Sequence, residues 1–76
     1  MILVKLDLSN HPEALVKGYR AGTGIELSRW CQEQGLIYNQ DYDWAVITAK
    51  KELHFRFYGN NQSVATLFTL KWAQYL

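Results

Sequence analysis

The sequence predicts a two-layer α+β domain, in which helices cover one face of a mainly antiparallel three-stranded sheet. Residues 2–8 alternate apolar and polar side chains with the period of two that is typical of a half-buried strand. Residues 43–49 and 52–58 are two further β-prone runs, and the short polar interruption at Lys50-Lys51 predicts a hairpin between them. Apolar residues at helical spacing elsewhere in the chain supply the second layer.

We expect the elements in the order β-α-α-β-β-α within one compact domain spanning residues 1–76, because 76 residues suffice for one domain and not for two. The first helix should begin near Pro12, with Asn10 as its N-cap. Three glycines between positions 18 and 24 should keep this helix short, since glycine lowers helix propensity.

The second helix is predicted to open at Thr23. Thr23 and Glu26 have the spacing of a capping box, in which each side chain bonds the other's backbone N–H. Gly35 is well placed just after the last helical residues. Leu36 would then pack back on Cys31, as in a Schellman helix end.

The last segment, residues 63–75, follows a turn signal at residues 59–61 and fits a third helix. Thr66 and Thr69 weaken this prediction, because β-branched side chains lose freedom in helices. A short final strand is the alternative, in which Phe68, Leu70 and Trp72 alternate. The helical stripe would consist of Val64, Leu67, Phe68, Lys71, Trp72 and Tyr75.

The outer face of the hairpin is expected to meet a partner. The even positions of residues 52–58 carry basic and aromatic side chains, opposite the apolar odd positions. The two faces of residues 43–49 are harder to distinguish. We place the odd positions from Ala45 to Ala49 inward, which leaves Trp44 outside. The expected interaction face consists of Lys5, Trp44, His54, Arg56 and Tyr58.

The aromatic content suggests what this face does. The chain is 49% hydrophobic and 14% aromatic, whereas a domain of this size hides only about 60% of its unfolded surface. Some aromatic side chains should therefore remain exposed, and Trp, Tyr and Arg are the preferred anchors of protein interfaces. We expect a non-enzymatic protein-interaction module that binds a partner protein or a second copy through the outer sheet face or a sheet edge.

Nucleic acid is the alternative partner for the same face. Sheet-surface aromatics beside basic residues can stack single-stranded bases. Eight Lys and Arg against seven Asp and Glu give a net charge of only +1, however, which is not the basic footprint of a nucleic-acid binder.

No apolar run approaches the roughly 20 residues of a membrane helix, and the N-terminal run is too short for a signal peptide. We therefore expect a cytoplasmic protein without membrane contact.

The sequence contains no recognised catalytic or nucleotide-binding motif, and we expect no cofactor or metal. The glycines of Gly22-Thr23-Gly24 are interpreted as corner residues rather than as an anion site. Cys31, the only cysteine, should behave as a small buried hydrophobe rather than a reactive thiol.

Three carboxylates form the one candidate chemical cluster. Asp7, Asp41 and Asp43 would converge if residues 2–8 and 43–49 were antiparallel neighbours. Such a group could hold Mg²⁺ or act in acid–base chemistry. The simpler interpretation, which we favour, is that they are solvated strand ends and caps.

One string in the last third of the chain resembles a known group of proteins. Phe55-x-Phe57, followed by Ala65-Thr66-Leu67-Phe68-x-Leu70-Lys71-Trp72, resembles the C-terminal end of small uncharacterised proteins of tailed bacteriophages. Compact phage proteins of this size often bind and modulate a host protein. The resemblance thus implies a phage-encoded modulator or inhibitor acting in the host cytoplasm, and it assigns no functional residue.

Overall fold

The computed structural model describes residues 1–11 and 22–76, and these residues form the expected α+β class. Their order is β-α-β-β-α, which differs from the expected β-α-α-β-β-α. The additional helix, expected to begin near Pro12, falls outside the described residues. The elements are β1 (Ile2–Asp7), α2 (Thr23–Glu33), β2 (Tyr42–Ile47), β3 (Glu52–Phe57) and α3 (Gln62–Lys71), with 3-10 turns at Thr48–Lys50 and Ala73–Tyr75.

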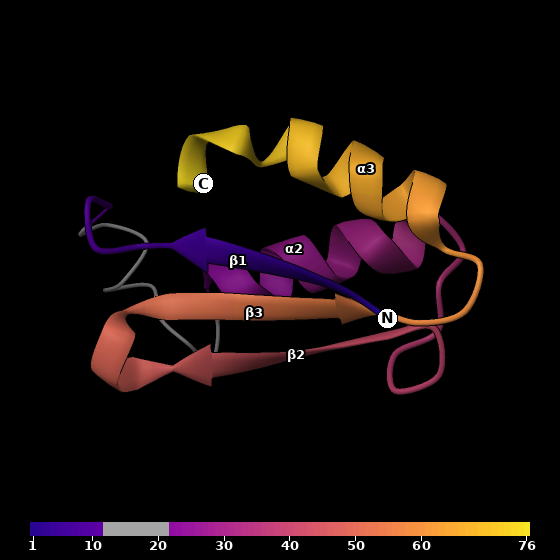
Figure 1. Ribbon diagram of the computed structural model, residues 1–76, viewed down its shortest axis with the longest axis horizontal. Coiled ribbons are helices and arrows are strands. Elements are labelled where there is room, and N and C mark those ends of the chain that lie inside the picture. The colour runs from indigo at the N-terminus through magenta and orange to yellow at the C-terminus, as the bar shows by residue number, and fades with distance from the viewer. Residues whose placement is uncertain (12–21) are drawn as a thin grey trace.

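The three strands form an antiparallel sheet in the order β1-β3-β2, as Figure 1 shows. β3 is the central strand and is antiparallel to both neighbours. Because both edge strands run opposite to β3, β1 and β2 run in the same direction, and β3 lies between them. The antiparallel hairpin of β2 and β3 confirms the prediction from their two β-prone runs.

Both helices lie on the same side of the sheet and form the second layer (Figure 1). Phe55 and Phe57 of β3 pack on Phe68 of α3, with ring centroids 4.8 and 5.3 Å apart. Leu27 and Cys31 supply the buried face of α2. The core contains Val4, Leu6, Leu8, Leu27, Cys31, Leu36, Tyr42, Leu53, Phe55, Phe57, Ala65, Phe68 and Trp72.

β2 faces the opposite way from our prediction. The register pairs Trp44 with Phe55, so the Trp44 ring lies on the helix side and stacks on Phe55 at 5.7 Å. Ala45 lies on the outer face, opposite His54, and Ala49 is exposed in the turn after the strand. The prediction was wrong because it compared two mixed faces. An indole ring buries far more apolar surface against the core than a methyl group does.

The aromatic side chains are hidden far better than the composition predicted. Tyr38, at 44% exposure, is the only exposed aromatic side chain among residues 1–11 and 22–76. Stacking within the core achieves this, because Tyr42 stacks on Phe55 and Trp44 stacks on the same ring. The aromatic surplus is thus a feature of the core rather than of the outer sheet face.

The end of α2 confirms the expected Schellman motif. Gly35 has a φ of 90°, and its N–H bonds the carbonyl of Gln32 at 2.9 Å. The N–H of Leu36 bonds the carbonyl of Cys31 at 3.2 Å, and both of these residues are buried. The helix begins at Thr23, as predicted, but its cap differs from the prediction. Its N-cap is Gly22, so Thr23 and Glu26 do not form a capping box.

The last segment is helical, so the alternative of a final strand is wrong. Thr66 and Thr69 are accommodated because their hydroxyls donate to the carbonyls of Gln62 and Ala65, one turn earlier, at 3.0 and 2.9 Å. The buried stripe runs through Ala65, Phe68 and Trp72, whereas Leu67 and Lys71 of the predicted stripe are exposed. No helix within the described part of the chain is long and apolar enough to cross a membrane.

Candidate interaction site

The outer face of the sheet contains three of the five predicted interaction residues. Lys5 and His54 lie opposite each other on β1 and β3, and Arg56 follows His54 on the same face. Tyr58 lies just beyond the end of β3. Trp44 does not belong to this group, because it lies on the helix side.

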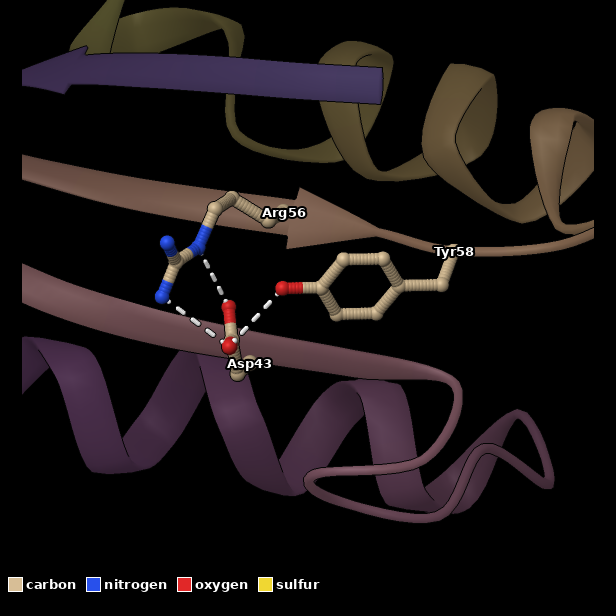
Figure 2. Close-up of polar contacts among 3 residues, drawn as sticks. All are labelled: Asp43, Arg56 and Tyr58. Carbon is tan, nitrogen blue, oxygen red and sulfur yellow. Dashed lines mark hydrogen bonds and ion pairs between the residues drawn. The ribbon is translucent and has the colours of Figure 1, made fainter. Parts of the chain in front are cut away.

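Arg56 and Tyr58 both bind Asp43 of the neighbouring strand (Figure 2). The guanidinium of Arg56 donates from Nε to Oδ1 of Asp43 at 2.6 Å and from Nη2 to Oδ2 at 2.9 Å. The Tyr58 hydroxyl donates to the same Oδ2 at 2.9 Å. This hydrogen bond raises the pKa of Tyr58, and the paired carboxylate raises the pKa of Arg56. The strongest cation of the face is therefore already neutralised within the chain.

The remaining polar groups of the outer face are mostly paired as well. His54 Nε2 lies 2.9 Å from Oε1 of Glu52 on the same strand. Lys5 is exposed, and no side-chain bond joins it to another described residue. Of Trp44 and Tyr58, only Tyr58 lies beside this face, through its bond to Asp43. The arrangement offers one unpaired cation rather than a basic aromatic surface.

The structure does not bring the three carboxylates together. Asp7 ends β1 opposite Glu52, whereas Asp43 lies opposite Arg56 near the other end of the sheet. The condition for convergence fails because β3 separates the two strands. Asp41 instead accepts a hydrogen bond from the backbone N–H of Ile37 at 2.7 Å. Within residues 1–11 and 22–76, no group of three His, Cys, Asp or Glu side chains is placed to hold a metal ion.

Cys31 is fully buried on α2, as its place on the apolar face predicted. Burial raises the pKa of its thiol to about 12. The nucleophilic thiolate is consequently scarce at neutral pH, which is the behaviour of a core residue.

A groove between α2 and β2 was not predicted from the sequence. It has a volume of about 280 Å³. Ile25 and Tyr38 are exposed at 37% and 44%, and Trp44 is half-buried. The lining is thus mainly apolar, with a few polar atoms, which is usual for a recognition groove. Its lining residues are Ile25, Ser28 and Gln32 of α2, Tyr38 of the loop and Trp44 of β2.

Gly24 allows the ring of Trp44 to lie against α2 and so to line this groove. A Cβ atom at Gly24 would overlap the six-membered ring of Trp44, so only glycine allows the ring to lie against the first turn of α2. The glycine that we interpreted as a corner residue serves a close approach between two elements. The signal was present as a glycine inside a predicted helix, but its partner is 20 positions away.

Along the groove, no other strand of residues 1–11 and 22–76 pairs with the outer edge of β2. The N–H of Tyr58 bonds the carbonyl of Asp41, so Asp41 and Tyr58 form a hydrogen-bonded pair. Hydrogen-bonded pairs recur at every second residue of an antiparallel ladder, so the backbone groups of Asp43, Ala45 and Ile47 also point toward β3. The N–H and C=O groups of Trp44 and Val46 therefore point away from the sheet. The start of the strand is closed, since the N–H of Asn39 bonds the carbonyl of Tyr42 at 2.7 Å.

Comparison of the chain with models of known protein families, with curated proteins and with solved structures found no match. The site is therefore interpreted from its own geometry.

Proposed function

We propose that this chain is a non-enzymatic protein-interaction module that binds an extended protein segment along the open edge of β2. In this mode the segment adds a fourth strand to the sheet, and its backbone bonds the outward N–H and C=O groups of Trp44 and Val46. The observation that carries the proposal is the coincidence of an open sheet edge with an apolar groove beside it.

The groove supplies specificity that backbone pairing lacks. Side chains of an added strand alternate between the two faces of the sheet. Those pointing toward the helices would enter the space beside Trp44, between Ile25 and Tyr38. A segment with an apolar side chain at that position would bury the exposed parts of these residues. The partner expected is thus an extended chain with alternating apolar side chains.

The proposed site lies at the edge of the sheet and not on its outer face. A sheet edge was the second location expected from the sequence. Arg56 is held by Asp43, and Trp44 is not available to stack bases on the outer face. These contacts give the single-stranded nucleic-acid alternative little support. The resemblance to small phage proteins would place the partner in a host cell, as a modulated host protein.

The test uses peptides selected against the folded protein from a random peptide display library. We expect the selected peptides to bind the wild-type chain and the Trp emission to change on binding, because Trp44 lines the groove. Val46→Pro should weaken binding at least about tenfold, because it removes an outward N–H without breaking a bond to β3. Leu3→Pro is the matched control, since Leu3 has the same orientation on the opposite edge.

Circular dichroism and thermal unfolding of each variant establish that the sheet is intact. Peptides that bind Val46→Pro and wild type equally would contradict the proposal, as would a monomeric chain against which no peptide is enriched.

A further inference from the structure

We infer that the segment added to β2 is β2 of a second copy of this chain, running antiparallel about a two-fold axis at Ala45. The inference rests on the proposed function, because it requires the same open edge. It joins two three-stranded sheets into one continuous sheet of six strands. Three properties of β2 support a second copy.

The first property is the register that the open edge allows. Trp44 and Val46 are the two residues of β2 whose outward N–H and C=O groups are open. The carbonyl of Tyr42 is already bonded by Asn39, and the turn begins at Thr48. Antiparallel pairing of two such edges therefore places Trp44 opposite Val46 of the second copy, and Val46 opposite its Trp44. A shift by one pair in either direction would bring in Tyr42 or Thr48. The edge thus matches itself in one register.

The second property is the residue at the axis. Ala45 would lie opposite Ala45 of the second copy as a non-hydrogen-bonded pair, because its own backbone groups bond β3. Such pairs bring the Cα atoms to about 4.5 Å, closer than in hydrogen-bonded pairs. A residue that meets itself there must be small and uncharged, since like charges directly opposite destabilise a sheet. Alanine satisfies both requirements.

The third property is the distribution of side chains along β2. Val46 of the second copy would lie beside Trp44 on the helix side, at the mouth of the groove. Antiparallel pairing also brings the start of β2, with the carboxylate of Asp41, toward the Lys50-Lys51 end of the second copy. Lys50 and Lys51 are exposed and carry no ion pair to any residue in the described ranges. The two ends are therefore complementary in charge.

The first experiment measures the mass of the assembly by size-exclusion chromatography with light scattering and by sedimentation equilibrium. Wild type should be a dimer. Val46→Pro should raise the dimer dissociation constant at least about tenfold, because one backbone bond is lost on each side of the axis. Leu3→Pro should leave the dimer unchanged. A monomeric wild type, or a Val46→Pro variant that dimerises as tightly as wild type, would overturn the inference.

The second experiment tests the two-fold axis itself. Ala45→Arg and Ala45→Glu change a side chain on the solvent face of the sheet, so each monomer should fold as wild type. Each variant alone should fail to dimerise, because it opposes like charges at the axis, whereas an equimolar mixture should form a heterodimer. A mixture that stays monomeric, or single variants that dimerise as wild type does, would refute pairing at Ala45.

The two proposals fail separately. A foreign peptide does not place a second residue 45 at the axis, so peptides selected against the edge should bind Ala45→Arg. If those peptides bind and the wild type is monomeric, the second copy is excluded and the interaction module stands. If no peptide binds and Val46→Pro has no effect in either assay, the edge itself is not a binding site.

Discussion

Gly24 of α2 leaves space for the ring of Trp44, and this contact yields a prediction at the scale of single residues. Gly24→Ala should destabilise the protein by about 1–3 kcal/mol, because a Cβ must displace a ring packed between the helix and Phe55. The measurement is urea unfolding followed by circular dichroism and by Trp emission.

A double-mutant cycle separates this clash from the helix propensity of alanine. In a Trp44→Leu background the ring is absent, so Gly24→Ala should be neutral or stabilising by up to about 1 kcal/mol. An equal loss of stability in both backgrounds would mean that Trp44 is not what excludes the methyl group.

The buried and outer positions of single residues were predicted correctly in the strand whose two faces differ clearly in polarity. The odd and even positions of residues 52–58 separated cleanly into apolar and polar sets, and the register confirms them. Trp44 was misplaced because Ala45 and Ile47 formed an equally apolar set beside it. Only the pairing of Trp44 with Phe55, a contact between residues of different strands, decides which set is buried.

The hydroxyl pair of Ser28 and Tyr42 joins α2 to β2 and gives a prediction at the scale of elements. Tyr42 is fully buried, and its hydroxyl donates to the backbone carbonyl of Ser28 at 3.0 Å, while Oγ of Ser28 lies 2.6 Å from it. Tyr42→Phe should lower the free energy of unfolding by about 1–2 kcal/mol, because the Ser28 hydroxyl then stays buried without this partner. Equilibrium denaturation measures the loss.

Ser28→Ala provides the matched test of this pair. In the Tyr42→Phe background it should cost less than it does in the wild type, because each substitution removes the hydrogen bond between the two hydroxyls. Strictly additive losses would show that the two hydroxyls act independently.

Elements were predictable where their signals are local. The end of α2 followed from Gly35 and Leu36, because a Schellman motif needs only a residue with positive φ and an apolar one after it. The cap at the start of α2 did not, since Gly22 took the cap position that we assigned to Thr23. The strand order and the groove depend on pairing between distant segments, about which local spacing carries no information.

At the scale of the whole molecule, three buried or hydrogen-bonded groups make the fold sensitive to alkali. Burial raises the pKa of Cys31 from 9.0 to about 12 and also raises the pKa of Tyr42, while the bond to Asp43 raises that of Tyr58. A raised folded-state pKa contributes stability that is complete below the unfolded pKa and is lost as the pH rises toward the folded value. These three groups should therefore leave stability unchanged between neutral pH and about pH 9, and stability should then decline toward pH 12.

Cys31→Ala isolates the thiol in this decline. Each titrating group contributes a slope of about 1 kcal/mol per pH unit within its window. The variant should thus lose stability less steeply than wild type between pH 9 and 12, even if its stability at neutral pH is lower. Urea unfolding at several pH values measures the slopes, and identical slopes would contradict the assignment to Cys31.

The hydrogen bond between Asn39 and Tyr42 bears on the tendency of the protein to aggregate. The stretch Trp44-Ala45-Val46-Ile47 is apolar, uncharged and β-prone, which is the composition of segments that stack into amyloid. The loop before it closes the strand at Tyr42, and the Thr48–Lys50 turn ends the strand after Ile47. Only a very short template remains, too short to recruit long strands of unrelated chains. We therefore expect the loop that limits what can bind at β2 to limit fibril growth as well.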